Sequence, residues 1–264
     1  MKIVVIGGTG LIGSKTVEKL KQRGHEAVAA APNTGVDTIT GKGLAGALAG
    51  AEVVIDVSNS PSLEEKAAMN FFGTSARNIA EAERTAGVRH HVALSVVGTD
   101  RLQDSGYFRA KLAQERLIGD SGVPYSLIHA TQFFEFMRSI AQTSTVGGTV
   151  RLPPVKFQPM AADDVASAMV DVALGDPVNG LIEIAGPEAF TMEEAIRRVL
   201  DFDHDSRKIV ADPDALYFGA PVGVRTLMPG PDARLGTTRY DWWLTHVPPP
   251  PKVVIATPAV EPAH

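Results

Sequence analysis

The chain has 264 residues, 44% of them apolar and 21% charged, and 25 Lys and Arg against 30 Asp and Glu give a net charge of −5. This is an ordinary globular composition with enough apolar side chains for a sizeable core, and its mild acidity argues against a nucleic-acid partner, which would require a basic surface. The sequence has no cysteine and no apolar run of about 18 residues, which excludes disulfides, thiolate metal sites, a cysteine nucleophile and a membrane-spanning helix.

Strand and helix patterns alternate along the first half of the chain. Residues 2–6 are a short, β-branched apolar run, typical of a strand buried on both faces of a parallel sheet. The next segment, 11–23, has apolar residues at helical spacing and stops at Gly24. Further strands are predicted at 27–31, 53–55, 91–97 and 125–130, and helices at 106–119 and, with Gly73 as a candidate break, at 62–86. This alternation predicts an α/β fold with a doubly wound parallel sheet.

The regular alternation loosens after residue 143. Here the patterns predict a helix at 161–174, a strand at 181–185 and a helix that begins at Thr191, where Glu194 has the spacing of a capping box. We therefore expect residues 1–143 to form a Rossmann-like core and residues 144–264 to form a smaller lobe over the sheet, with segments that return to the core. Six of the 18 prolines lie in the last 17 residues, and Pro248 to Pro251 predict an extended arm.

A glycine-rich turn separates the first predicted strand from the first predicted helix. It reads Gly7-Gly8-Thr9-Gly10-Leu11-Ile12-Gly13, with glycines at the first, fourth and seventh places. A tight turn directly after a buried strand, a bare backbone and a helix N-terminus are what a bound pyrophosphate requires. An ordinary strand–helix turn is the alternative, but the context of the motif favours dinucleotide binding. The predicted cofactor contacts are Gly7, Thr9, Gly10, Leu11, Ile12 and Gly13.

The end of the second predicted strand indicates which dinucleotide is bound. An acidic residue there would hold the ribose diol of NAD, but the segment 29–35 contains none, and Asp37 lies past the turn. Asn33 and Thr34 offer hydrogen bonds to a 2′-phosphate, although no arginine accompanies them. NADP is therefore favoured, and NAD is the alternative.

Ser95, Tyr107 and Lys111 form the candidate catalytic group. Ser95 is near the end of a predicted strand, at the sheet edge where ligands bind, and Tyr107 and Lys111 are four residues apart on one helical face. A nearby ammonium lowers the pKa of a phenol and makes it a better proton donor, while a serine hydroxyl stabilises a developing oxyanion. Each residue alone has an ordinary structural explanation. Together, after a dinucleotide turn, they predict a reductase site.

At these residues the chain resembles the short-chain dehydrogenase/reductase superfamily, in its atypical, NmrA-like branch. The resemblance is good over residues 1–136, where it includes the glycine turn, Tyr107 with Lys111, and the segments 73–82, 92–95, 121–125 and 133–134. It implies that Ser58 and Thr131 border the cofactor and that Lys111 also holds the nicotinamide ribose. The chain departs from the superfamily at 57–60, which is not Asn-Asn-Ala-Gly, and at 129–131, where Arg-Pro-Gly is common.

Aromatic residues follow the strand predicted at 125–130. Core packing explains part of the segment 132–137, but Gln132 and Phe133 are also candidates for the wall of a substrate pocket. We expect no metal site, because the acidic segment 201–205 lacks the glycine and glutamate of a calcium loop.

The favoured hypothesis is an NADP(H)-dependent reductase of a carbonyl or quinone-like small molecule. The alternative is a non-catalytic redox sensor that binds NADP(H) and signals to a partner protein. A sugar-nucleotide epimerase is disfavoured, because the C-terminal lobe is short for a nucleotide sugar. The short apolar start is unlike a signal peptide, which favours the cytoplasm, and the sequence is compatible with a homo-oligomer.

Overall fold

The computed structural model describes residues 1–247, so the arm predicted at Pro248 to Pro251 lies outside the described residues. Its centre is a seven-stranded, all-parallel sheet with the strand order β12-β9-β5-β4-β3-β1-β2. The strands are β1 (Lys2–Ile6), β2 (Glu26–Ala30), β3 (Val53–Asp56), β4 (His90–Val96), β5 (Tyr125–Ala130), β9 (Gly180–Ala185) and β12 (Arg234–Leu235). The predicted α/β fold with a parallel, Rossmann-like sheet is confirmed.

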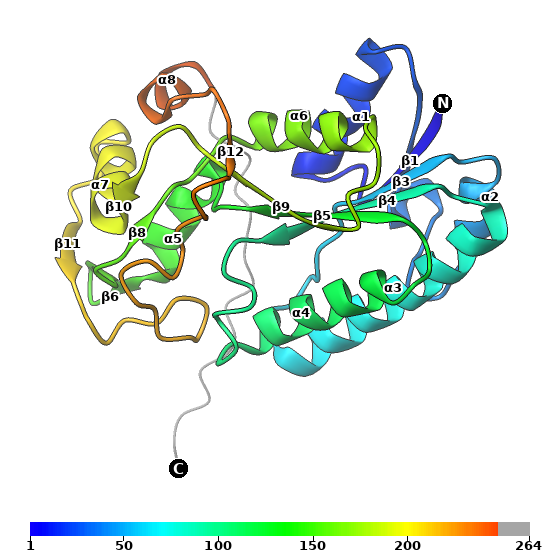
Figure 1. Ribbon diagram of the computed structural model, residues 1–264. Helices are drawn as coiled ribbons and strands as arrows, with labels where there is room; N and C mark the ends of the chain where they lie inside the picture. Colours follow the sequence, from blue (N-terminus) through cyan, green and yellow to red (C-terminus); the bar gives the residue numbers. More distant parts are fainter. Residues whose placement is uncertain (248–264) are drawn as a thin grey trace.

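Helices cover both faces of this sheet (Figure 1). Ile3, Val5 and Ile55 face α1 (Leu11–Gln22) and α6 (Ala162–Ala173), whereas Val4 and Val54 face the opposite side. Neighbouring side chains of a strand point to opposite faces. The continuous apolar runs of β1 and β3 therefore supply a core on each side.

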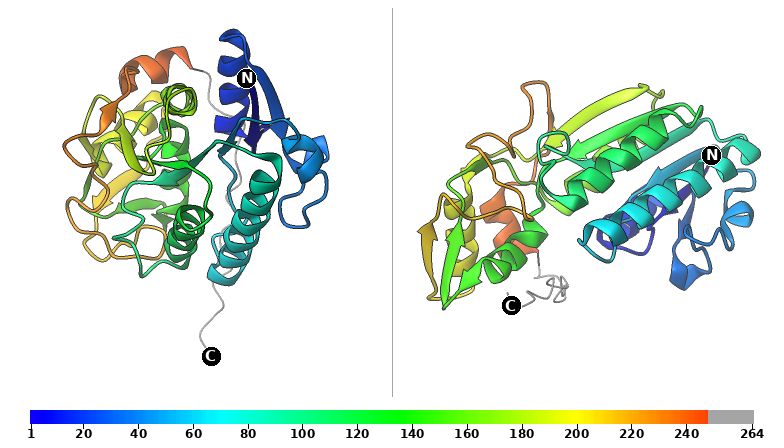
Figure 2. Two further views of the ribbon diagram at one scale, coloured as in Figure 1. Left: turned by 45° about the vertical axis from the view of Figure 1, so that its right-hand side comes forward. Right: turned by 90° about the horizontal axis from the view of Figure 1, so that it is seen from below.

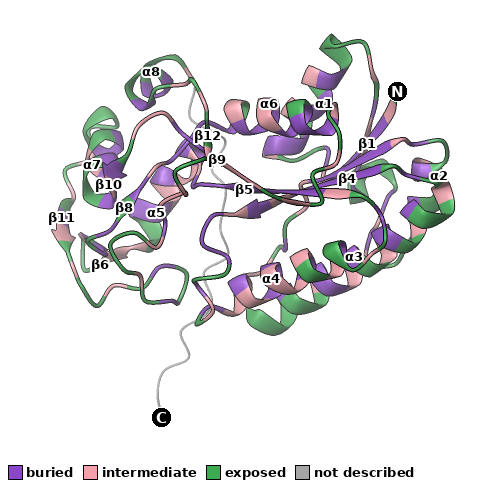
Figure 3. Ribbon diagram, viewed as in Figure 1, coloured by how far each residue is buried: buried purple, intermediate pink, exposed green. Residues whose placement is uncertain are grey.

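The second face is covered by α3 (Glu65–Ala86) and α4 (Gly106–Gly119), which lie side by side, with the short α2 (Leu44–Leu48) at the sheet edge (Figure 2). The candidate break at Gly73 is wrong, because α3 runs unbroken to Ala86. Its first turn is capped by the Glu64 carboxylate, which accepts from the N–H groups of Lys66 and Ala67. The faces of α3 and α4 that point away from the sheet are largely exposed (Figure 3).

A second packed cluster lies beside the sheet. Its strands form a sheet of β6 (Thr145–Val146), β7 (Thr149–Leu152) and β11 (Lys208–Ala211) and a pair of β8 (Lys156–Phe157) and β10 (Phe190–Thr191). Its helices are α5 (Met137–Thr143), α7 (Met192–Phe202), α8 (Tyr240–His246) and the 3₁₀ turn η2 (Phe134–Phe136). The core of this cluster includes Phe134, Phe157 and Trp243.

The N-terminus of α7 has the predicted capping box. The Thr191 hydroxyl accepts from the Glu194 N–H at 3.2 Å, and the Thr191 N–H donates to the Glu194 carboxylate at 2.7 Å. The segments α6, β9 and β12 return to the main sheet, whereas Phe134 and its neighbours pack into the second cluster. The division of the chain after residue 143 stays a prediction. Within residues 1–247, no helix is long and apolar enough to cross a membrane.

Candidate active site

The glycine turn joins β1 to α1 at the carboxyl edge of the sheet. Gly7 has φ +76°, a left-handed conformation that favours glycine. A Cβ at Gly13 would lie 2.1 Å from the Gly7 carbonyl oxygen, so the helix can approach the turn only without that atom. Gly10 is exposed, and a Cβ there would meet only the Gly7 oxygen, at 3.3 Å. The turn therefore combines a tight backbone with an open surface at Gly10.

The N-terminus of α1 has the features of an anion site. Gly10 is its N-cap residue, no side chain among residues 1–247 caps the helix, and its first turn has no acidic residue. The first N–H groups of a helix have no partner within the helix and carry a partial positive charge. These N–H groups and the open backbone of the turn fit the diphosphate of a dinucleotide.

The segment after β2 lies against this turn. The Thr9 hydroxyl donates to Asn33 Oδ1 at 3.0 Å, which places the exposed Asn33 side chain beside the glycine turn. The Thr34 hydroxyl instead closes the 3₁₀ turn η1 (Pro32–Thr34), because it accepts from the Ala31 N–H and lies 2.9 Å from the Ala31 carbonyl oxygen. Asp37 accepts from the Ile39 N–H, and the pKa of its carboxyl is lowered by such backbone hydrogen bonds.

The loop after β3 connects the glycine turn to Tyr107. A Cβ at Gly7 would lie 3.0 Å from the Ser58 backbone, so the two segments are in direct contact. The Ser58 N–H and hydroxyl both donate to the buried Asp56 carboxylate, at 2.9 and 2.6 Å. The next residue, Asn59, accepts a hydrogen bond from the Tyr107 hydroxyl at 2.9 Å. Two adjacent residues therefore join the phenol to the dinucleotide turn.

The ring of Tyr107 packs among other aromatic rings. Its centroid lies 5.8 Å from that of Phe72, 5.4 Å from that of Phe108 and 6.5 Å from that of Phe218. This burial raises the pKa of the phenol. The sequence predicted a lowered pKa, and that direction is wrong for this arrangement.

The position of Lys111 explains why the pKa of Tyr107 is not lowered. Its side chain is 3% exposed, and its ammonium donates to the Leu94 carbonyl at 3.0 Å and to Gln114 Oε1 at 2.6 Å. Gln114 in turn donates to Asp56 Oδ2 at 3.0 Å. Burial lowers the pKa of Lys111 to about 8, although the Asp56 carboxylate favours the charged form. Among the described residues, the ammonium is therefore bonded to this polar network and not to the Tyr107 hydroxyl.

Ser95 faces α4. Its buried hydroxyl donates to the Glu115 carboxylate, which also accepts from His129 Nε2 at 2.9 Å. Burial would raise the pKa of Glu115, but His129, Ser95 and Lys111 together lower it. The three predicted catalytic side chains are thus hydrogen-bonded to different partners: Ser95 to Glu115, Lys111 to Gln114 and Tyr107 to Asn59.

Four polar residues of this region are not among the residues predicted from the sequence: Asp56, Asn59, Gln114 and Glu115. One signal for two of them was available, because Gln114 and Glu115 follow Lys111 by three and four residues on the same helical face. Nothing local marks Asp56 or Asn59 as site residues, because their partners on α4 lie 58 and 48 residues away in the chain.

Three predicted residues follow β5. The Thr131 hydroxyl donates to the Gln158 carbonyl at 2.7 Å. The Phe133 ring stacks on Phe136 with centroids 5.4 Å apart, and Gln132 is buried.

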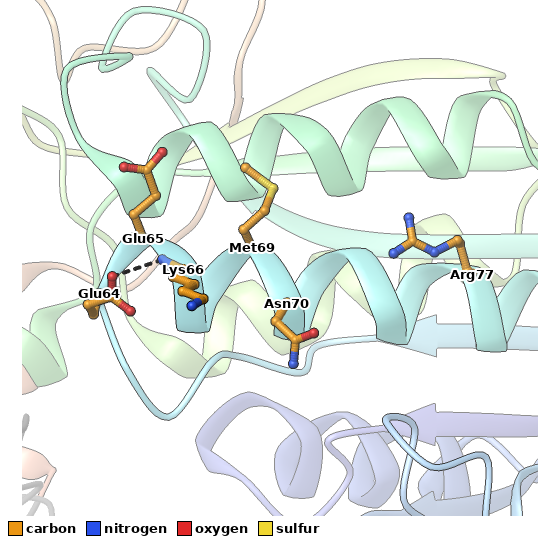
Figure 4. Close-up of a pocket in the computed structure, with 6 residues that line it drawn as sticks. All are labelled: Glu64, Glu65, Lys66, Met69, Asn70 and Arg77. Atoms are coloured by element: carbon orange, nitrogen blue, oxygen red, sulfur yellow. Dashed lines mark hydrogen bonds between the residues drawn. The ribbon is translucent and has the colours of Figure 1, made fainter.

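A shallow pocket of about 630 Å³ lies on α3, but it is not the dinucleotide site (Figure 4). No residue of the glycine turn lines it. Its lining residues are Glu64, Glu65, Lys66, Met69, Asn70 and Arg77.

Comparison with protein families assigns the chain to a family. The profile of the NAD(P)H-binding family matches residues 7–176, which include the glycine turn, Asn59, Tyr107 and Lys111. The chain belongs to the NAD(P)H-binding family. A nicotinamide dinucleotide is accordingly the class of cofactor, and the NAD(P)H-binding resemblance expected from the sequence is confirmed. A comparison with curated protein sequences found no relative.

Solved structures of similar fold extend this finding. A short-chain dehydrogenase/reductase superfamily protein from Agrobacterium tumefaciens with bound NAD has a TM-score of 0.70 at 14% identity, covering 93% of this chain and 95% of that one. A dTDP-4-dehydrorhamnose reductase from Clostridium acetobutylicum has a TM-score of 0.68 at 13% identity, with 93% and 92% covered. A UDP-N-acetylglucosamine 4-epimerase from Bacillus cereus has a TM-score of 0.62 at 18% identity, with 80% and 88% covered. These likenesses establish the fold.

Proposed function

We propose that the protein is an NADP(H)-dependent oxidoreductase that reduces a carbonyl or quinone-like small molecule. The observation that carries the proposal is the contact series from Gly7 through Ser58 and Asn59 to the Tyr107 hydroxyl. Through these contacts the Tyr107 hydroxyl, the proposed proton donor, is connected to the glycine turn. The reductase and NAD-bound neighbours of the same fold are consistent with it.

Each residue has a proposed role in holding the cofactor. The N–H groups at the start of α1 and the backbone of Gly7 to Gly13 bind the diphosphate. Asn33 faces the adenosine ribose, and the absence of a carboxylate at the end of β2 favours the 2′-phosphate of NADP. Ser58 and Thr131 border the nicotinamide half. The bound cofactor supplies a hydride.

Tyr107 supplies the proton. Because burial raises the pKa of its phenol, the hydroxyl stays protonated at neutral pH. An oxygen that gains alkoxide character is a stronger base than a phenolate, so proton transfer to it from the phenol is downhill. Asn59 holds the hydroxyl in place until substrate accepts its hydrogen bond.

Ser95 and Lys111 complete the proposal. Ser95 orients the carbonyl once its hydroxyl rotates away from Glu115. The Lys111 ammonium lies 4.7 Å from the centroid of the Phe72 ring, which also contacts Tyr107. The proposed role of this ammonium is to bind the nicotinamide ribose.

The test is a turnover assay that follows the loss of NADPH absorbance with a panel of aldehydes, ketones and quinones. The Tyr107→Phe variant should lose about 10²- to 10⁴-fold in kcat while its affinity for NADPH is unchanged. Tyr125→Phe, which removes a hydroxyl near Gly119, is the matched control and should keep full activity. Full activity in Tyr107→Phe would show that the proton comes from elsewhere.

The redox-sensor function is the second candidate, and the direction of the Lys111 ammonium favours it. A sensor needs no tuned proton donor, and in this structure the ammonium bonds Leu94 and Gln114. Tight NADPH binding without turnover on the whole panel, together with a co-purifying partner protein, would select this function.

A further inference from the structure

The side chain of Gln132 is buried without a hydrogen-bond partner. Gln132 lies just after β5 and is 6% exposed. Neither its Oε1 nor its Nε2 has a partner within residues 1–247. Most buried amides are hydrogen-bonded, and an unsatisfied one destabilises the fold. A ligand that supplies the missing partners would account for this group.

A strained turn lies next to this amide. Tyr217 and Ala220 exchange two backbone hydrogen bonds of 2.8 and 3.0 Å, which closes a two-residue loop. Its central residues, Phe218 and Gly219, have φ of +49° and +80°. Glycine and asparagine are favoured in such turns, whereas a bulky residue at positive φ is strained. Strain of this kind concentrates at functional sites.

The turn places two aromatic side chains in the candidate site. The Phe218 ring is 39% exposed and stacks on Tyr107 at an interplanar angle of 29°. The Tyr217 phenol is buried beside Gln132. Burial raises the pKa of that phenol, and the Gln132 amide, which lies close to the hydroxyl without reaching hydrogen-bond geometry, opposes the rise. The turn therefore stacks the Phe218 ring on Tyr107, the proposed proton donor. It also brings the Tyr217 hydroxyl close to the Gln132 amide.

We propose that Gln132, Tyr217 and Phe218 form the specificity site for the substrate. The Gln132 amide and the Tyr217 hydroxyl bind an uncharged polar group of the substrate, and the Phe218 ring covers the flat apolar ring that carries this group. All three side chains are uncharged, and a charged group buried among them would lack a counter-ion. The substrate class is then an aromatic carbonyl compound with a neutral amide-like or hydroxyl substituent. This inference rests on the proposed function.

Two aldehydes of similar shape test the polar contact. The probe 4-formylbenzamide carries a carboxamide, and 4-isopropylbenzaldehyde carries an apolar group of the same branching in its place. The wild type should prefer the benzamide by about tenfold in kcat/KM. Gln132→Met should lose this preference, so that its kcat/KM values for the two aldehydes lie within about twofold of each other. Gln142→Met, at an exposed glutamine, is the control and should keep the preference.

Binding without turnover separates this inference from the proposed function. Both aldehydes are titrated calorimetrically into the protein loaded with NADP⁺, which cannot reduce them. A tenfold binding preference without activity in the turnover assay would reject the reductase function and keep the specificity site. Equal binding of both aldehydes by the wild type, or an unchanged preference in Gln132→Met, would overturn the inference.

The Phe218→Gly variant tests the aromatic cover. Glycine relieves the strain at φ +49° and removes the ring. If Phe218 covers the substrate, KM for both aldehydes should rise about tenfold while the melting temperature does not fall. Unchanged KM values with a lowered melting temperature would show that the ring only stabilises the fold.

Discussion

The substitution Gly13→Ala tests the packing of the dinucleotide turn. The new Cβ would lie 2.1 Å from the Gly7 oxygen, about 1.3 Å closer than the 3.4 Å at which ordinary contact begins. Alanine gains about 1 kcal/mol of helix propensity in α1, but an overpacked methyl group costs about 1–3 kcal/mol. We therefore expect a net loss of up to about 2 kcal/mol in the free energy of unfolding. The displaced helix start should also weaken NADPH binding at least about tenfold.

The matched control is Gly46→Ala in α2. A Cβ there meets nothing within 4 Å, so this variant should gain about 0.5–1 kcal/mol and keep its NADPH affinity. Urea unfolding followed by tryptophan fluorescence gives the free energies, and NADPH fluorescence gives the dissociation constants. If Gly13→Ala gained stability as Gly46→Ala does and bound NADPH normally, the packing argument would be refuted.

Three further predictions concern a helix cap, a buried ammonium and the choice of cofactor. Thr191→Ala removes the cap of α7 and should lower the free energy of unfolding by about 1 kcal/mol in a urea titration, and no loss would show that the cap is dispensable. Lys111 has a folded pKa of about 8 and a model-peptide value of 10.5. Below about pH 8 the Lys111 amine is protonated in both the folded and the unfolded state. Between about pH 8 and pH 10.5 it is protonated only in the unfolded chain, so the free energy of unfolding rises with pH in this range. From about pH 7 to about pH 10 the wild type should gain about 2 kcal/mol relative to Lys111→Met, and parallel pH profiles would contradict the low pKa. Asn33→Asp places a carboxylate after β2 and should shift the ratio of kcat/KM values from NADPH toward NADH at least about tenfold, whereas an unchanged ratio would remove Asn33 from the cofactor site.

The fold was predictable because its signals are local. The runs of β1 and β3 are apolar on both faces, which only a strand covered on both sides requires. The glycines of the turn follow β1 directly, and Thr191 and Glu194 form a box within one helical turn. Each of these patterns indicates its local structure from residues that lie within about ten positions of one another.

The contacts of the candidate site were not predictable in this way. Lys111 and Tyr107 have the expected helical spacing, but the partner of each side chain is chosen by distant residues. The Lys111 ammonium donates to the Leu94 carbonyl and to Gln114, and Gln114 in turn donates to the buried Asp56 carboxylate. Such competition among buried polar groups depends on tertiary packing, which helical periodicity does not encode.

The crystal structure of the complex with NADPH tests the central claim most directly. We predict that the diphosphate contacts the N–H groups at Gly10 to Gly13 and that the nicotinamide C4 faces the Tyr107 hydroxyl across a space for one carbonyl group. A nicotinamide ring bound away from Tyr107, with the phenol still bonded to Asn59 and shielded from the ring, would contradict the proposed reductase function and leave only a cofactor-binding protein.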